Sequence, residues 1–215
     1  MRITLVHALK HSIVPIEASF AKLWPDARLM NLLDDSLSAD LARDGGLTDA
    51  MTERFLRLGR YAAGTGSDAI LFTCSAFGPC IEAVARAHAP MPVLKPNEAM
   101  IDEAVALQRT RGGSVGLVAS FGPTLASMVP EFPADVPLRT ALAHGALDAL
   151  DRGDLAAHDH AVLQAAETLA SQGCTLIALT QFSLARARDP LAAALALPVL
   201  TTPDSAVRAL RQRLA

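Results

Sequence analysis

The chain has 215 residues, of which 51% are hydrophobic and only 4% aromatic, and its 41 alanines supply much of the apolar mass. This length allows a sizeable core, and the composition favours helices packed closely on a sheet. A formal net charge of -3 makes nucleic acid an unsuitable partner. No apolar run approaches the roughly 18 residues of a membrane span, and no leader-like segment opens the chain. We therefore expect a cytoplasmic protein with no membrane partner.

Short apolar runs alternate with longer amphipathic stretches, which is typical of a parallel α/β sheet covered on both faces. In chain order, the expected strands are Ile3–His7, Ala27–Leu32, Ala69–Thr73, Val93–Leu94, Val115–Ala119, Leu138–Leu142, Leu176–Thr180 and Val199–Leu200. The expected helices are Pro15–Leu23, Thr48–Ala63, Pro79–Ala89, Asn97–Arg111, Ala156–Gln172 and Ser205–Leu214. The segment Asp34–Leu47 shows neither pattern and is expected to be a loop.

A weak internal repeat divides the chain. Asp68–Cys74 (DAILFTC) and Thr175–Gln181 (TLIALTQ) align without a gap, and each follows an expected helix and a glycine-containing turn. We therefore expect an α/β fold of two similar halves with parallel sheets. The first half is residues 1–97, the second is residues 98–203, and a final helix at 204–215 packs back on the first half.

The three cysteines lack the short paired spacing of a zinc site or a redox dithiol. Only Cys74 directly follows an expected strand, at the carboxyl edge where parallel sheets bind ligands. A helix starting near Pro79 would lower the pKa of this thiol, so we expect Cys74 to take part in chemistry. The alternative is that Cys74 is a small packing residue, as we expect for Cys80 and Cys174.

Polar residues also follow strands elsewhere in the chain. Thr180 and Gln181 end the strand of the second repeat, and Ser120 and Phe121 follow Val115–Ala119. Hydroxyls and backbone amides from these strand ends would suit a carboxylate or enolate oxygen without any metal.

The histidines are less distinctive. His7 and His11 follow the first strand and are candidates for the same site, whereas His88, His158 and His160 lie on expected helices and should be solvated. No glycine-rich nucleotide motif, nucleophile elbow or HExxH sequence is present, so we expect no cofactor and no metal.

Five segments, in their order and spacing, resemble the aspartate/glutamate racemase superfamily, which includes hydantoin racemases, maleate isomerases and arylmalonate decarboxylases. They are DAILFTCS (68–75), PVLKPNEAM (92–100), VGLVASFGPT (115–124), HGALDALDRGD (144–154) and GCTLIALTQFSL (173–184). The resemblance implies two pseudo-symmetric α/β halves with the active site in the cleft between them. It also implies a cofactor-independent isomerase that takes a small carboxylate or amino-acid-like substrate, and it is compatible with a homodimer.

Racemases of this family place one cysteine from each half on opposite faces of the substrate's α-carbon. Cys74 matches the first cysteine, but Gln181 stands at the position of the second, and an amide cannot exchange a proton in that way. The second catalytic cysteine is therefore absent. By the same resemblance, the positions expected to bind substrate are Ser75, Ser120, Phe121 and Thr180. His7 and Gln181, which follow expected strands, are further candidates.

The leading hypothesis is a racemase-like enzyme in which the Cys74 thiol moves a proton at a carbon next to a carboxylate. One alternative is a single-cysteine decarboxylase or cis-trans isomerase of a small dicarboxylate, in which Gln181 orients the substrate. Another is a carboxylate-binding protein without turnover. Selectivity for the substrate's side chain would come from Leu9–Ile13 and Asp34–Leu47.

Overall fold

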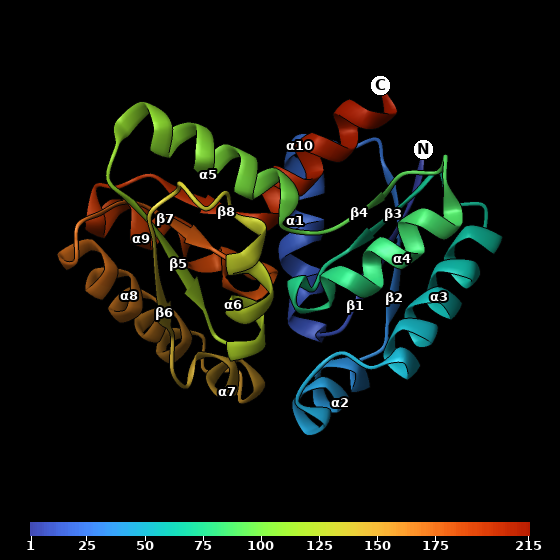
Figure 1. The fold of residues 1–215 in the computed structure, drawn as a ribbon, viewed down its shortest axis with the longest axis horizontal. Helices are drawn as coiled ribbons and strands as arrows, with labels where there is room; N and C mark the ends of the chain where they lie inside the picture. Colours follow the sequence, from blue (N-terminus) through green and yellow to red (C-terminus); the bar gives the residue numbers. More distant parts are fainter.

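The computed structural model describes residues 1–215 and shows two lobes, each built on a four-stranded parallel sheet (Figure 1). The first sheet has the order β2-β1-β3-β4 and the second has the order β6-β5-β7-β8. The strands are β1 (Arg2–His7), β2 (Arg28–Leu33), β3 (Ala69–Phe72), β4 (Val93–Leu94), β5 (Ser114–Ala119), β6 (Leu138–Leu142), β7 (Cys174–Leu179) and β8 (Val199–Thr201). The predicted fold class, α/β with two similar halves, is confirmed.

Ten helices accompany the sheets, and none of them is both long and apolar enough to cross a bilayer. They are α1 (Ile13–Leu23), α2 (Ser36–Asp44), α3 (Asp49–Gly64), α4 (Gly78–His88), α5 (Glu98–Arg111), α6 (Gly122–Met128), α7 (Ala146–Asp151), α8 (Leu155–Ser171), α9 (Arg188–Leu195) and α10 (Thr202–Leu214).

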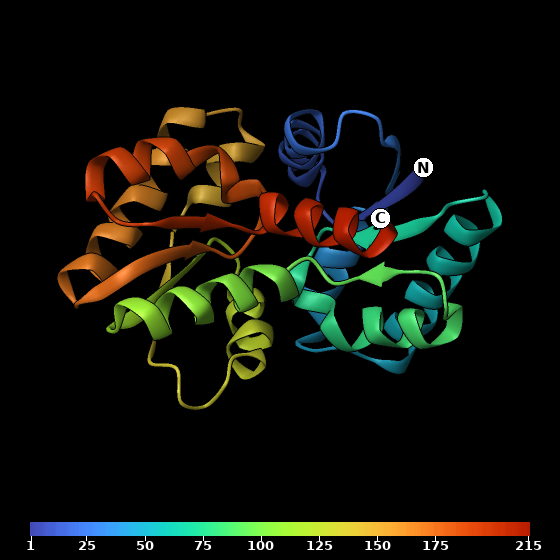
Figure 2. The same ribbon diagram turned by 90° about the horizontal axis from the view of Figure 1, so that it is seen from above.

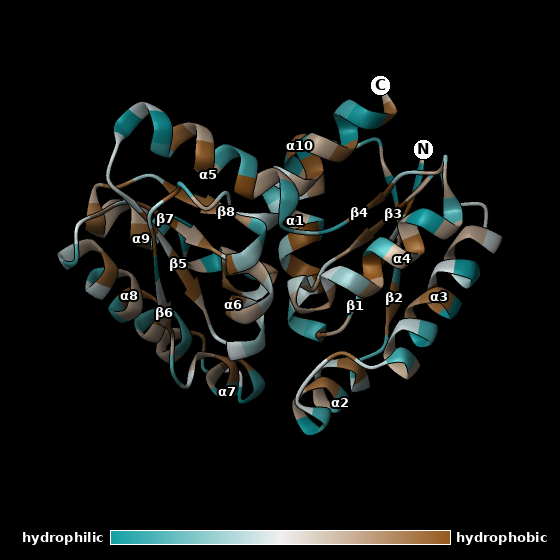
Figure 3. Ribbon diagram, viewed as in Figure 1, coloured by the Kyte–Doolittle hydropathy of each residue, from teal (hydrophilic) through white to brown (hydrophobic).

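Helices cover both faces of each sheet, because successive side chains of a strand point to opposite faces. On β3, Phe72 packs in a cluster with Phe55 of α3, whereas Leu71 packs in a separate cluster with Phe20 of α1 and Val207 of α10. The central strands are accordingly apolar along most of their length (Figure 3). Burial on both faces explains why these strands read as continuous apolar runs.

The expectation of a loop over Asp34–Leu47 is wrong, because this segment contains α2. Helices α6, α7 and α9 also lie in segments where no helix was expected. All four are short, at six to nine residues, so each presents too few turns for a clear amphipathic repeat. Helix α2 ends at Gly45, whose φ of 69° is a left-handed conformation that glycine adopts without strain.

The C-terminal helix α10 lies between the lobes, next to α1 and α5 (Figure 2). Ser19 of α1 donates a 2.6 Å hydrogen bond to Asp204, and Ser205 donates a 2.8 Å bond to Glu103 of α5. Helix α10 therefore contacts both lobes. The division of the chain at residues 97 and 98 stays a prediction.

Candidate active site

The central strands of the two sheets end in the same way. The second residue after each strand has an extended backbone and lies directly before a helical turn, which is a short 3-10 helix in three cases and α6 in the fourth. These residues are Leu9 after β1, Cys74 after β3, Phe121 after β5 and Gln181 after β7. Cys74 has φ -126° and ψ 116°, and Gln181 has φ -130° and ψ 146°. Cys74 and Gln181 thus occupy equivalent positions in the two lobes, as do Leu9 and Phe121.

Cys74 and Gln181 line one small cavity, which we call the inner cavity. Ser75 and Thr180 line it as well, and the remaining lining residues are Leu9, Ser12, Thr73, Pro96, Phe182 and Ser183. Its volume of about 10 Å³ is room for about one water molecule. Four of the predicted site residues therefore meet at one place, and the lining comes from both lobes.

Two hydrogen bonds join the lobes beside this cavity. The Ser75 hydroxyl donates to the Thr180 carbonyl oxygen at 3.1 Å, and the Ser127 hydroxyl donates to the Ser75 carbonyl oxygen at 3.0 Å. Ser75 and Thr180 are both almost fully buried. The predicted pair Ser75 and Thr180 thus lies at the contact between the lobes.

The Cys74 thiol is held in its neutral form. Only 8% of the residue is exposed, and this burial raises the pKa of the thiol to about 11, despite the nearby Ala76 amide and Ser38 hydroxyl. The expectation of a lowered pKa is therefore wrong, because desolvation outweighs the helix terminus. The Ser38 hydroxyl donates to the Ala8 carbonyl oxygen at 3.0 Å, so it must turn before it can donate to a thiolate.

Gln181 has a fixed orientation. Its Oε1 accepts hydrogen bonds from the backbone N–H of Ser120 at 2.6 Å and from the Ser120 hydroxyl at 3.2 Å. The Ser120 N–H can donate to the amide oxygen of Gln181 but not to its amide nitrogen, so the oxygen must face Ser120. The amide nitrogen Nε2 is therefore free to donate to a ligand. Ser120 does not line the inner cavity and acts on it through Gln181.

His7 does not line the inner cavity either. Its ring is fully buried, with Nδ1 at 2.8 Å from the Thr73 hydroxyl and Nε2 at 2.9 Å from Oδ1 of Asn31. Asn31 in turn donates to Glu17 at 2.7 Å, so its Oδ1 faces His7 and accepts a hydrogen bond from Nε2–H. Burial lowers the pKa of His7, and the ring is neutral. His7 therefore supports Thr73, the residue before Cys74.

Phe121 lines a second, larger space, which we call the outer cavity. It has a volume of about 360 Å³, and Leu9 lines both this cavity and the inner one. Its other lining residues are Lys10, His11, Asp35, Ser38, Ala39, Ala42, Leu147 and Asp151. Most of its wall comes from Leu9–Ile13 and Asp34–Leu47, the two segments expected to select the substrate's side chain, although the second contains α2 rather than a loop.

An ion-pair group spans the lobes at the outer cavity. His11 Nε2 lies 2.9 Å from Asp151 Oδ1, and Lys10 Nζ lies 3.4 Å from the same oxygen. These contacts hold the pKa of the Asp151 carboxyl below its usual value. Of the candidate histidines, His11 thus lines the outer cavity and not the inner one.

Two serines of the inner cavity were not singled out from the sequence. Ser12 lies at the start of α1, and Ser183 is 2% exposed with a hydroxyl that has no hydrogen-bond partner. Both come from polar stretches just after a central strand, and that position was the available signal. Side chains of this kind can bind a carboxylate oxygen.

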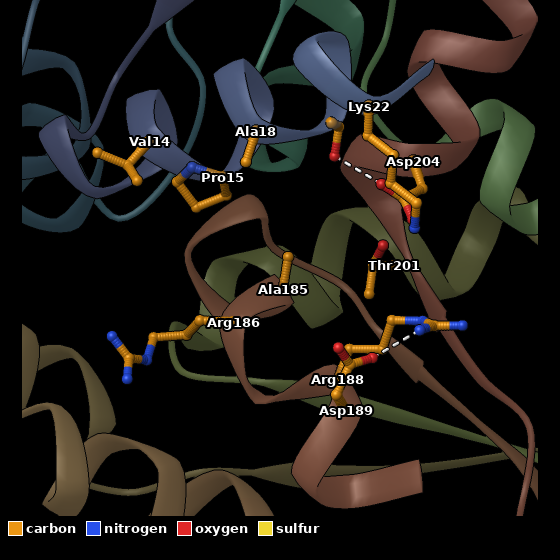
Figure 4. Close-up of a pocket in the computed structure, with 11 residues that line it drawn as sticks. Val14, Pro15, Ala18, Lys22, Ala185, Arg186, Arg188, Asp189, Thr201 and Asp204 are labelled. Atoms are coloured by element: carbon orange, nitrogen blue, oxygen red, sulfur yellow. Dashed lines mark hydrogen bonds and ion pairs between the residues drawn. The ribbon is translucent and has the colours of Figure 1, made fainter.

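A further cavity of about 270 Å³ lies between α1 and the segment around Arg186 (Figure 4). Its charged side chains are paired within the protein, for example Arg188 with Asp189 at 2.6 Å. Arg186 binds Asp159, which also contacts His158 at 2.8 Å. His158 is fully buried, so the expectation that it is solvated is wrong. No group of three or more His, Cys, Asp or Glu side chains is placed to hold a metal ion.

Solved structures share this fold. A glutamate racemase of Bacillus anthracis, isoform RacE1, has 12% identity and a TM-score of 0.77 over 99% of this chain and 80% of its own. An allantoin racemase from Klebsiella pneumoniae has 15% identity and a TM-score of 0.69, covering 100% and 87%. A variant of arylmalonate decarboxylase has 19% identity and a TM-score of 0.64, covering 98% and 92%. At these identities the likeness concerns the fold alone.

The sequence itself places the chain in a family. None of the curated proteins compared with the chain matches it. Residues 16–210 match the family described as Asp/Glu/Hydantoin racemase, which is nearly the whole chain. This match agrees with the two-lobed fold and with the isomerase predicted from the sequence. The chain therefore belongs to the Asp/Glu/Hydantoin racemase family.

Proposed function

We propose that this racemase-like protein transfers a proton at a carbon next to a carboxylate, with Cys74 as the thiol acid and base. The observation that carries the proposal is the meeting of Cys74 and Gln181, from equivalent strand ends, in one cavity lined by hydroxyls. The substrate is a small carboxylate. We further propose a cytoplasmic location, with which three free cysteines agree, and a homodimer.

The chemistry follows from the groups around the thiol. As a thiolate, Cys74 removes a proton from the substrate carbon, and the electron pair of the broken C–H bond moves into the carboxylate as an enolate. The Gln181 Nε2–H and the serine hydroxyls donate hydrogen bonds to the enolate oxygens. As a thiol, Cys74 returns a proton to the same face of the carbon, which exchanges the hydrogen with retention of configuration. Inversion requires a second donor at the opposite face.

A second candidate is a reaction on one face only, in which loss of carbon dioxide produces the carbanion. The electron pair of the broken carbon–carbon bond stays on the substrate, the Cys74 thiol protonates it, and water then restores the thiol. Two observations favour this candidate: the resting thiol is neutral and ready to donate, and Gln181 cannot deliver a proton from its own position.

Deuterium uptake tests the proposal. Candidate amino acids, hydantoins and substituted malonates are incubated with the protein in deuterated water, and label at the α-carbon is followed by NMR. We expect uptake with at least one class, and a loss of at least about 100-fold in Cys74→Ala, since acid-base groups contribute that much. Cys80→Ala, which removes a buried thiol outside the cavity, should retain the activity.

The configuration of the labelled product separates the two candidates. A single labelled enantiomer supports one-faced protonation, whereas both enantiomers show that a second donor reaches the face opposite Cys74. Absence of uptake with every class, or full uptake in Cys74→Ala, would refute the role of Cys74.

A further inference from the structure

The outer strands of the two sheets differ in how open their edges are. β4 and β8 have only two and three residues, and β6 carries the exposed Arg139. Short strands and charged side chains are common protections of a sheet edge. β2 has six residues, four of them exposed, and no charge between Arg28 at its start and Asp34 just after its end. β2 is therefore the edge most open to another strand.

Half of the main-chain groups along β2 point away from its sheet. The N–H groups of Arg28 and Asp34 donate to the carbonyl oxygens of Met1 and His7, at the two ends of β1, at 2.8 and 3.0 Å. The register between the two strands has no shift, so the even-numbered residues of β2 face β1. Because N–H and C=O groups alternate between the two edges of a strand, the odd-numbered residues turn theirs outward. They are Leu29, Asn31 and Leu33.

The sequence along this edge is complementary to its own reverse. From Arg28 to Asp34 it reads RLMNLLD, with opposite charges at the two ends, two apolar residues inside each end and Asn31 in the middle. A second copy of the strand, placed antiparallel about a twofold axis at Asn31, therefore sets Arg28 opposite the partner's Asp34. The same arrangement sets Met30 opposite the partner's Leu32.

This register also satisfies the main chain. In an antiparallel pair, opposed residues whose N–H and C=O groups face each other exchange two hydrogen bonds. Here the outward-facing Leu29 lies opposite the partner's Leu33, and Asn31 lies opposite the partner's Asn31, so the outward groups find partners. A register shifted by two residues in either direction sets Arg28 opposite an uncharged residue. Charge thus selects the register centred on Asn31.

The pairing would also cover exposed apolar side chains. Met30 is 38% exposed and Leu33 is 41% exposed. Leu32 packs against the apolar cluster under α3, and Leu29 packs against the cluster under α1, on the other face of the sheet. Opposed residues share a face, so Met30 would contact the partner's Leu32 and Leu33 would contact the partner's Leu29. Each exposed side chain thereby joins the apolar cluster of its own face.

We propose that two copies of this chain associate through β2, antiparallel and centred on Asn31, and join their first sheets into one continuous sheet. This inference rests on the homodimer proposed above and assigns its interface. Association stops at the dimer, because the twofold pairing occupies the β2 edge of both copies. One strand from each copy makes a small interface, so we expect a dissociation constant on the order of 10 μM.

Sedimentation equilibrium of the intact protein from about 1 to about 300 μM tests the proposal, since this range brackets the affinity expected for a small interface. We expect a monomer–dimer equilibrium in the wild type. Leu33→Lys and Met30→Lys should each raise the dissociation constant at least about tenfold, because a charge on an edge strand opposes pairing. Leu155→Lys, at an exposed leucine of the second lobe, should leave the constant unchanged.

The charged ends of the strand give a weaker effect of defined sign. Arg28→Glu sets like charges opposite each other and should raise the dissociation constant by up to about fivefold. The effect is limited because the pair is exposed and Asp34 also binds Arg54 of its own chain at 2.6 Å. A tighter dimer in Arg28→Glu would overturn the register.

Cross-linking tests the register without disturbing the apolar contacts of the core. Two copies of residue 30 are diagonal neighbours in the proposed pairing, with Cα atoms about 7–8 Å apart. Met30→Cys should therefore be joined into a covalent dimer by a short bis-maleimide, whereas Leu155→Cys should not. The three native cysteines are buried, so the introduced thiol is the one that reacts. Equal cross-linking of the two variants would contradict the proposal.

The outcomes separate this inference from the proposed function. A dimer whose affinity is unchanged in Leu33→Lys and Met30→Lys uses another surface, which overturns this inference and leaves the homodimer. A monomer at every concentration overturns both, and oligomers larger than a dimer overturn the closed twofold pairing. The role of Cys74 is tested separately, by deuterium uptake.

Discussion

At the scale of single residues, the place of Cys74 in the fold follows from nearby sequence, whereas the pKa of its thiol depends on residues that are distant in the chain. The sequence places Cys74 after β3, because an apolar run followed by a thiol is visible in a short segment. Its pKa could not be predicted in this way. The raised value comes from burial among residues that are distant in sequence, and the Ser38 hydroxyl of α2 only partly offsets it.

The reactivity of Cys74 should follow from its burial. With a pKa near 11, the thiol is expected to react slowly with iodoacetamide at pH 7 and progressively faster between pH 9 and 11. Peptide mass spectrometry can measure this rate for Cys74 separately from Cys80 and Cys174. Rapid and complete labelling at pH 7 would show that the thiolate is already present in the free protein.

His158 should make stability depend on pH. Burial lowers the pKa of His158, so as the pH falls below about 6.5 the unfolded chain takes up a proton before the folded one does. The stabilisation is therefore complete above pH 6.5 and is lost as the pH falls toward the lowered pKa, at up to about 1.4 kcal/mol per pH unit. Urea unfolding at pH 7.5 and 5.5 measures the loss, which should be smaller in His158→Gln.

A second buried histidine, His7, also contributes to the loss of stability at low pH. Burial also lowers the pKa of His7, so His158→Gln should reduce the pH dependence without abolishing it. His160 is an exposed histidine on the same helix α8, so His160→Gln should leave the pH dependence of stability at the wild-type value. An identical pH dependence in His158→Gln and wild type would contradict the assignment.

At the scale of elements, length decided what could be predicted. The long helices α3, α5 and α8 have enough residues for a helical repeat, and the sequence predicted all of them. The strands were predicted from short apolar runs instead, because the central ones are buried on both faces. The short helices, including α2, depend on contacts with other elements, which a local pattern does not contain. The segment that contains α2 was expected to contact the substrate, so what the sequence did not reveal is the helical form of this part of the outer cavity.

The contact between α3 and α4 should be sensitive to a single methyl group. A Cβ at Gly59 of α3 would lie 2.5 Å from Cγ1 of Val84, too close for the two side chains to coexist without a shift. Gly59→Ala should therefore destabilise the protein by about 1 kcal/mol, because overpacking outweighs the better helix propensity of alanine. Thermal unfolding should show a melting temperature lower by a few degrees.

Gly64 of the same helix gives the comparison. A Cβ there meets no atom within 4 Å, so Gly64→Ala should melt at or slightly above the wild-type temperature. Equal melting temperatures for Gly59→Ala and Gly64→Ala would mean that α3 and α4 are not packed as closely as described.

At the scale of the whole molecule, the repeat predicted two lobes but not how they meet. The contacts between the lobes involve residues far apart in the chain, such as Ser75 with Thr180 and Lys95 with Glu131 at 3.1 Å. No periodicity marks such pairs. The sequence therefore indicated which strand ends carry polar residues, whereas their enclosure in a cavity of about 10 Å³ emerged only from the structure.

The contacts of Asp151 with the other lobe should make separation of the two lobes less frequent. Asp151→Asn weakens the contacts with Lys10 and His11 across the outer cavity, and exposed pairs of this kind contribute up to about 1 kcal/mol. Global stability should change by no more than that. Separation should become up to about fivefold more frequent, so Cys74 should be alkylated faster at pH 9 by a similar factor.

Asp135→Asn is the matched control, because Asp135 is also exposed but pairs with Arg109 of its own lobe at 3.6 Å. Its labelling rate should equal that of the wild type. Equal rates in Asp151→Asn and Asp135→Asn would show that the pair across the lobes does not restrain access to Cys74.

The hydrogen bonds of Gln181 have a consequence for the descent of such proteins. Its side chain is held by Ser120 of the same lobe, whereas the bonds that join the lobes run from Ser75 and Ser127 to main-chain carbonyls. Position 181 can thus accept a different side chain without disturbing the joint. The group that faces Cys74 and the contacts that hold the two lobes together are mechanically independent, so a single substitution at position 181 can alter the chemistry and leave the architecture intact.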